Sequence, residues 1–173
     1  ELIPASQEKM SELERNAEFF SSLSGMAHHA KFPKLYLPKI KLPQNYAKNK
    51  FYVIVPGASA DMKKWPVMFF STLAEKIYRN TDWNGLICGT KNEYHLGEQI
   101  LKTCTAPLEN IAGKTELVEL SGFLSQSQLI ITNDTGTAHI SSAVGTSTVC
   151  ILGGGHFGRF VPYPDLPGQT NKI

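Results

Sequence analysis

The fold of this chain is decided by the stretch LIITNDTGTAHISSAVG, residues 129–145. It begins with a short apolar run, residues 129–131, that predicts a buried strand. Polar turn residues follow at 133–136, and the apolar residues after them recur at roughly helical spacing until Gly145, a common helix terminator. The stretch therefore predicts a strand, a tight polar turn and a helix.

A turn of this kind forms a potential binding site for anions. Backbone N–H groups at the start of a helix have no partner within the helix, and the helix dipole adds a positive field there. Asp134 has the side chain of an N-cap, Thr135 offers a hydroxyl, and Gly136 allows close approach to the backbone. The ring of His139, one turn into the helix, can lean back toward the same point. We therefore expect the ligand site here.

Apolar strands alternate with helical patterns along residues 51–152. We expect strands at 51–55, 85–88 and 147–152, helices at 66–80, 92–104 and 115–126, and a short strand or turn at 110–113. Thr115 is the expected cap of the third helix. Such alternation predicts an α/β fold with an open, doubly wound parallel sheet and helices on both faces. In such sheets the ligand lies beyond the carboxyl ends of the strands.

The first fifty residues differ in pattern from the rest. Residues 5–25 show an amphipathic helical pattern whose apolar face carries Leu13 and Phe20. Residues 31–50 contain evenly spaced prolines and several lysines, which predict an extended, solvated connector. We expect residues 1–50 to be a helix and a linker that precede a domain formed by residues 51–173.

Composition narrows the classes of function. The chain has 173 residues and a net charge of +2, so bulk charge indicates neither nucleic-acid nor membrane binding. Its apolar runs are too short to span a bilayer, no signal peptide is visible, and it starts at Glu1 rather than Met. We therefore expect a cytoplasmic piece of a longer chain. Cys88, Cys104 and Cys150 are widely spaced, which is typical of reduced core cysteines rather than of disulfides or a metal site.

Small and polar residues follow the expected strands. Ser59 and Lys63 come after the first strand, Glu93 after the second, and the turn at 133–136 after the central one. Small residues at helix starts suit phosphate oxygens, a lysine supplies the opposing charge, and a carboxylate suits sugar hydroxyls. Together these residues indicate a site for a nucleoside diphosphate.

Each of these residues also has a purely structural interpretation. Asp134 could serve only as an N-cap, His139 could only pack in its helix, Lys63 could be solvated, and Glu93 could only stabilise the start of its helix. The sequence GGGHFG at 153–158 matches a dinucleotide-binding fingerprint, but prolines after it exclude the helix that this motif requires. We expect a loop at the rim of the pocket there instead.

Three motifs carry a resemblance to a known family. They are PGAS at 56–59 with KKWP at 63–66, IAGKT at 111–115, and NDTGTAH at 133–139. Residues 51–152 look like the C-terminal half of glycosyltransferase family 9, the ADP-heptose:lipopolysaccharide heptosyltransferases. The resemblance implies a GT-B fold, in which two Rossmann-like domains face each other across a cleft. The family usually has Gly-Pro-Thr after the last strand, whereas this chain has GGGHFGRF, which leaves the identity of the donor open.

The resemblance also implies roles for particular residues. Ser59 and Lys63 would contact the donor phosphates, Glu93 would hold the ribose, Thr135 and Gly136 would meet the pyrophosphate, and Asp134 and His139 would orient that turn or touch the sugar. The transfer would invert the anomeric centre without a metal or another cofactor. The catalytic base would lie in an N-terminal domain, so no catalytic residue is expected among residues 1–173.

By the same resemblance, the donor would be a nucleotide-sugar such as ADP-heptose and the acceptor a lipopolysaccharide core. The N-terminal domain of the same protein would be a further partner, in the cytoplasm or at the inner face of the bacterial inner membrane. Two alternatives stay open: another nucleotide-sugar enzyme of the GT-B fold, such as an epimerase, and a non-catalytic nucleotide-binding module.

Overall fold

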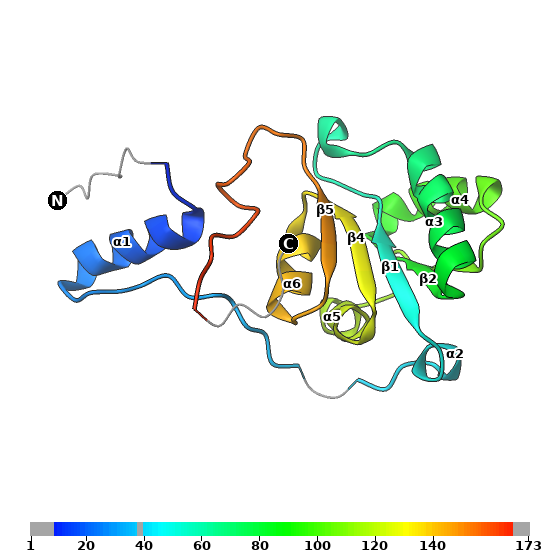
Figure 1. Ribbon diagram of the computed structural model, residues 1–173, viewed down its shortest axis with the longest axis horizontal. Helices are drawn as coiled ribbons and strands as arrows, with labels where there is room; N and C mark the ends of the chain where they lie inside the picture. Colours follow the sequence, from blue (N-terminus) through cyan, green and yellow to red (C-terminus); the bar gives the residue numbers. More distant parts are fainter. Residues whose placement is uncertain (1–8, 38–39, 168–173) are drawn as a thin grey trace.

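The computed structural model describes residues 9–37 and 40–167, in which a parallel sheet is the central layer (Figure 1). Its five strands are β1 Phe51–Val55, β2 Asn84–Ile87, β3 Leu108–Asn110, β4 Leu129–Asn133 and β5 Thr148–Ile151. They lie in the order β3-β2-β1-β4-β5, and every neighbouring pair is parallel. The order reverses between β1 and β4, which is where open α/β sheets form their ligand crevice.

The described helices include two layers on the two faces of the sheet and a first helix that lies apart from it (Figure 1). They are α1 Glu12–Ser24, α2 Gln44–Ala47, α3 Val67–Thr81, α4 Tyr94–Thr103, α5 Leu117–Gln126 and α6 Gly136–Ala143, with short 3₁₀ turns η1 Asp61–Lys63 and η2 Lys91–Glu93. In Figure 1, α3 and α4 lie on one side of the strands and α5 and α6 on the other. The predicted doubly wound α/β sheet is therefore confirmed. None of the described helices combines the length and the apolar character that a membrane span requires.

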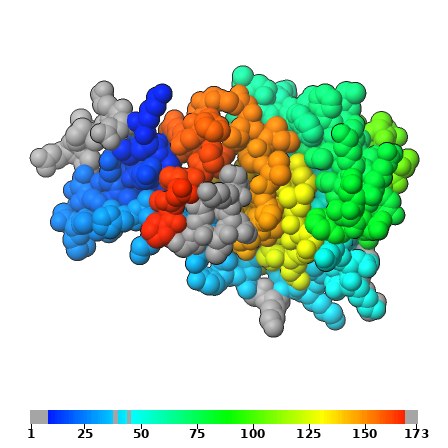
Figure 2. Space-filling model, viewed as in Figure 1, coloured from blue at the N-terminus to red at the C-terminus, as the bar shows by residue number. Residues whose placement is uncertain are grey.

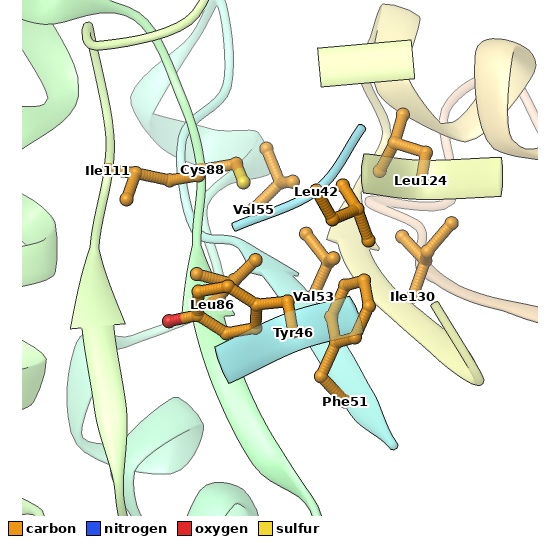
Figure 3. Packing of buried hydrophobic residues seen from close by; sticks show 10 residues of the cluster. All are labelled: Leu42, Tyr46, Phe51, Val53, Val55, Leu86, Cys88, Ile111, Leu124 and Ile130. Carbon is orange, nitrogen blue, oxygen red and sulfur yellow. The ribbon is translucent and has the colours of Figure 1, made fainter. Parts of the chain in front are cut away.

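Strand β1 divides its side chains between two cores, because successive residues of a strand point to opposite faces. Tyr52 and Ile54 pack with Phe70 of α3 and Ile100 of α4. Phe51, Val53 and Val55 belong to the other core, which contains Leu86, Ile130 and Leu124 of α5 (Figure 3). All five residues of β1 are buried, as expected of a central strand covered on both faces.

The connector before β1 contributes to the second core, which the sequence analysis did not anticipate. Leu42 and Tyr46 are buried in it, and the Tyr46 ring meets Phe51 edge-on with 5.4 Å between centroids (Figure 3). The expectation of a solvated connector holds for the exposed lysines but is wrong for these two side chains and for Phe32, which is also buried. The physical reason is that Leu42 and Tyr46 pack with Phe51 of β1 and Leu124 of α5 in this core.

Two helix starts also differ from the prediction. Helix α1 begins at Glu12 rather than at residue 5, because Ser11 and Glu14 form a capping box; residues 5–8 lie outside the described part of the chain. Helix α5 is capped by Glu116, whose backbone N–H donates to Glu119, and not by Thr115. Of the short strand or turn expected at 110–113, the strand β3 reaches only Asn110, and residues 112–113 form a turn. Helix α1 buries none of its residues; on its apolar face, Phe20 is exposed and Leu13 is half-buried.

The buried connector gives a prediction about stability. Leu42→Ala should lower the free energy of unfolding by about 2–4 kcal/mol, because it removes a buried side chain and leaves a cavity. Leu35→Ala is the matched control, since Leu35 lies in the same connector but is 44% exposed, and it should cost less than about 0.5 kcal/mol. Urea unfolding measures both. Equal costs in the two variants would mean that the connector does not belong to the core.

Candidate functional site

The carboxyl ends of β1 and β4 are joined by one buried side chain, Asn133. Its Nδ2 donates to the carbonyl oxygens of Pro56 at 2.8 Å and Gly57 at 3.2 Å, and its Oδ1 accepts from the backbone N–H of Trp65 at 3.1 Å. The loop after β1 is thus hydrogen-bonded to β4 at its beginning, at Pro56 and Gly57, and at its end, at Trp65. The sequence analysis placed Asn133 in the turn but gave it no role; a polar residue at the end of a buried strand was the available signal.

This arrangement brings Lys63 beside Asp134. Their Nζ and Oδ2 atoms are 2.8 Å apart, and both side chains are partly exposed. Asp134 is not the N-cap of α6, so that prediction is wrong. Its backbone N–H still donates to Ile151 of β5 at 3.1 Å, which keeps Asp134 in the sheet ladder, one residue before the capping position. Thr135 is the cap, and its hydroxyl accepts from the N–H of Thr137 at 3.3 Å.

The start of α6 is open to approach from outside. A Cβ placed on Gly136, the first residue of the helix, would meet no atom within 4 Å. The first backbone N–H groups of a helix and its dipole attract anions, and the Lys63 ammonium lies beside the adjacent Asp134. The anion site that the sequence predicted therefore has the geometry to accept a ligand.

Glu93 has a structural role that the sequence analysis had kept as an alternative. Its Oε2 accepts from the N–H and the hydroxyl of Thr90, at 2.7 and 2.9 Å, in a capping box. Its Oε1 lies over Gly57, where a Cβ would come within 1.9 Å of it. Glu93 thus links the loops after β1 and β2, and its contact with a ribose stays a prediction. Ser59 is exposed in the loop between β1 and η1.

His139 is half-buried and bonded to a residue that the sequence analysis missed. Its Nδ1 lies 2.6 Å from the hydroxyl of Tyr163, which follows β5 by twelve positions and carried no local signal. Burial lowers the pKa of His139, although the charge of Asp134 opposes that effect. Burial also raises the pKa of Tyr163. Both rings are therefore neutral at pH 7.

A cavity of about 300 Å³ lies beside the Lys63–Asp134 pair. Its outer wall is the C-terminal loop, residues 152–164, which contributes three consecutive glycines and the side chains of Leu152, Phe157, Phe160 and Val161. No helix follows the GGGHFG sequence within the described residues, so the prediction of a loop at the pocket rim is confirmed and the dinucleotide fingerprint does not apply.

The cysteines are free thiols with different degrees of burial. Cys88 is fully buried, which raises its pKa to about 12, and burial raises the pKa of the half-buried Cys150 to about 11. Thiols of this kind are poor nucleophiles at neutral pH. Within the described residues, no three histidine, cysteine or acidic side chains are grouped as a metal site would require.

Solved structures of known proteins share this fold. Escherichia coli heptosyltransferase WaaC with ADP superimposes with a TM-score of 0.60 at 16% identity, covering 84% of this chain and 46% of that one. A glycosyltransferase of family 9 from Veillonella parvula superimposes with a TM-score of 0.57 at 20% identity, covering 83% of this chain and 35% of that one. At these identities the likeness concerns the fold, and it defines this chain as a Rossmann-like domain of the GT-B type.

Sequence comparison identifies the family. The model of glycosyltransferase family 9 (heptosyltransferase) matches residues 4–170, so the chain belongs to this family. It is 32% identical over 151 residues to lipooligosaccharide heptosyltransferase 2 of Campylobacter jejuni, covering 83% of this chain and 46% of the relative. It is 29% identical over 119 residues to lipopolysaccharide core heptosyltransferase OpsX of Haemophilus influenzae, covering 68% of this chain and 34% of the relative. The chain therefore spans less than half the length of these relatives.

The environment of His139 predicts a pH dependence of stability. Its pKa is lower in the folded chain than the usual value of about 6.5, so the unfolded chain binds more protons in mild acid. The stabilisation from the neutral ring is complete above the usual pKa of about 6.5, and it is lost as the pH falls from there through the lower pKa of the folded chain. NMR titration should give His139 a pKa below that of an exposed histidine.

The matching stability measurement compares two variants between pH 7 and pH 5. His139→Gln should reduce the loss of unfolding free energy as the pH falls from 7 to 5. His29→Gln, at an exposed position, should leave that loss unchanged. A loss that is as large in His139→Gln as in the wild type would show that other groups cause it.

Proposed function

We propose that this chain is the donor-binding half of a heptosyltransferase that carries a sugar from ADP-heptose to a lipopolysaccharide core acceptor. Its membership of glycosyltransferase family 9 and the names of its relatives support this assignment. The observation that carries it is the placement of Lys63 and the open start of α6 together at the switch point of the sheet. That geometry suits a diphosphate linked to two larger groups, one on each side.

The donor would lie across the carboxyl ends of the strands. Its diphosphate would meet the first N–H groups of α6, the hydroxyl of Thr135, and Lys63, with Ser59 nearby in the same loop. The nucleoside would extend over β2 toward Glu93, and the sugar would enter the cavity between Asp134 and the C-terminal loop. His139, in α6, would stabilise the conformation of the turn at residues 133–136.

The reaction would be a direct displacement that inverts the anomeric carbon. As the glycosidic bond to the diphosphate breaks, negative charge grows on the leaving phosphate oxygen. The α6 N–H groups are oriented before the reaction, and Lys63, held by Asp134, would be drawn toward this charge as it grows. No metal or further cofactor is needed for this role, because the cation and the helix start supply the positive field.

The acceptor side requires a second wall and a general base. We assign both to the N-terminal half of the same protein, joined to the donor domain at residues 51–173 by the helix and connector of residues 1–50. The exposed apolar side chains of α1, among them Phe19, Phe20 and Leu23, support a packing partner there. The complete protein would act in the cytoplasm, where it meets its acceptor at the inner membrane.

Replacing the site lysine tests the assignment directly. Lys63→Ala should weaken ADP binding about tenfold, because a charge-assisted contact to phosphate contributes about 1.5–3 kcal/mol. Isothermal titration calorimetry measures the change. Lys64→Ala is the matched control: Lys64 pairs with the exposed Asp61 at 2.7 Å, and its loss should change affinity by less than about twofold.

A second variant, measured in the same experiment, blocks the proposed phosphate site without changing any charge. Gly136→Val places a side chain where the fold leaves open space, so the melting temperature should hold while ADP binding is lost. If Lys63→Ala and Gly136→Val both bind like the wild type, the strand ends are not the nucleotide site. Failure of the wild type to bind ADP, UDP and GDP would favour a module without nucleotide affinity.

The proposed division between a donor half and an acceptor half can also be tested. Residues 1–173 alone should bind donor but transfer no sugar, because the carboxylates at the site are already engaged: Asp134 with Lys63, Glu93 with Thr90, and Asp61 with Lys64. The hydrogen bond from Lys64 lowers the pKa of Asp61, which makes it a poor base.

The assay offers ADP-heptose and a deacylated core acceptor to the chain with and without its N-terminal half. Transfer should appear only when both halves are present. Turnover by residues 1–173 alone would contradict the assignment of the base, and Asp61→Asn would then be the first variant to test.

A further inference from the structure

The C-terminal loop is held at its far end by contacts to three separate segments. The hydroxyl of Tyr163 bonds to His139 of α6 at 2.6 Å, and its ring meets Phe32 edge-on with 5.5 Å between centroids. Arg159 bonds through its side chain to Glu12 of α1 at 2.6 Å, and its carbonyl accepts from the Glu12 N–H at 2.8 Å. Figure 2 shows the orange and red atoms of this loop between the blue helix α1 and the sheet.

The cavity wall lies between these contacts and β5, in a glycine-rich segment whose internal backbone hydrogen bonds lie within residues 154–161. It contains Gly153, Gly154, Gly155 and Gly158, and two of these have positive φ, +82° at Gly154 and +79° at Gly158. Glycine restricts the backbone less than any other residue, so the course of such a loop depends on its attachments. Tyr163 is the attachment that ties this wall to the helix at which the diphosphate is proposed to bind.

The chemistry of the Tyr163 hydroxyl and the His139 ring favours one of them as the hydrogen-bond donor. A phenol is a good donor and a weak acceptor, whereas the bare nitrogen of a neutral imidazole is a good acceptor. Burial keeps the phenol protonated and the imidazole neutral. Donation from Tyr163 to Nδ1 is therefore the favoured arrangement, and it leaves the one remaining imidazole proton on Nε2.

We propose that Tyr163 is a positioning residue for the donor site: its hydroxyl, bonded to Nδ1 of His139, holds the glycine-rich wall of the cavity against α6 and keeps Nε2–H as a donor. The proposal rests on the proposed function, because it takes the cavity to be the place of the donor sugar. Tyr163 acts through His139 and the loop, so its loss should reduce recognition of the sugar more than recognition of the nucleotide.

The test compares two ligands rather than one. Tyr163→Phe keeps the ring against Phe32 and removes only the hydroxyl. Calorimetry should measure the affinity of each protein for ADP and for ADP-heptose. In Tyr163→Phe the ratio of the ADP-heptose affinity to the ADP affinity should be about fivefold lower than in the wild type, while the affinity for ADP itself should change by less than about twofold. Tyr36→Phe, at a side chain that is 89% exposed, is the matched control and should leave both affinities unchanged. An unchanged ratio in Tyr163→Phe would overturn the proposal.

Two measurements without ligand keep the proposal testable if the proposed function fails. ¹⁵N NMR should find His139 protonated on Nε2 in the wild type, and amide hydrogen exchange at residues 153–161 should be several-fold faster in Tyr163→Phe. In a His139→Ala background the same substitution should add nothing. Protonation on Nδ1, or equal exchange in the two proteins, would refute the role of Tyr163; a wild type that binds neither ligand while both measurements hold would refute only the proposed function.

Discussion

The buried amide of Asn133 is the contact on which the candidate site depends. It bonds to the backbone of the β1 loop at Pro56, Gly57 and Trp65, from a position at the end of the neighbouring strand. A buried amide with unpaired atoms is costly, so these three bonds leave the loop little freedom. Lys63 lies within that loop, and its position beside Asp134 follows from the way Asn133 holds the chain on either side of it.

The pairing of Lys63 with Asp134 has two effects on a ligand. It keeps the ammonium in place, where an unpaired lysine would sample many rotamers. It also leaves the pair with no net charge, so an incoming diphosphate must attract Lys63 more strongly than Asp134 does. A diphosphate, whose two phosphates together carry two negative charges, can do so at a helix start, whereas a neutral ligand cannot. The pair therefore favours anions of high charge density over other small molecules.

The sequence predicted the parts of this structure that depend on local pattern. The alternation of strands and helices, the open parallel sheet and the turn at 133–136 all follow from spacing and from the residues that start and end helices. The residues missed or misassigned depend on contacts between distant segments. Asp134 has the chemistry of an N-cap, but a backbone bond to β5 keeps it in the sheet. Tyr46 and Tyr163 lie in proline-rich segments whose packing no local rule reports, and the proposed ligand contacts of Ser59 and Glu93 stay predictions.

The contact of Glu93 with Gly57 has a consequence for how sequences of this kind can change. Any side chain at position 57 would have to displace the carboxylate that caps η2. A substitution there would thus loosen a helix thirty-six positions along the chain, and shortening Glu93 would remove the reason for glycine at 57. The two positions are expected to vary together among related chains, as a linked pair in an alignment, although they come from different loops and share no hydrogen bond among those described.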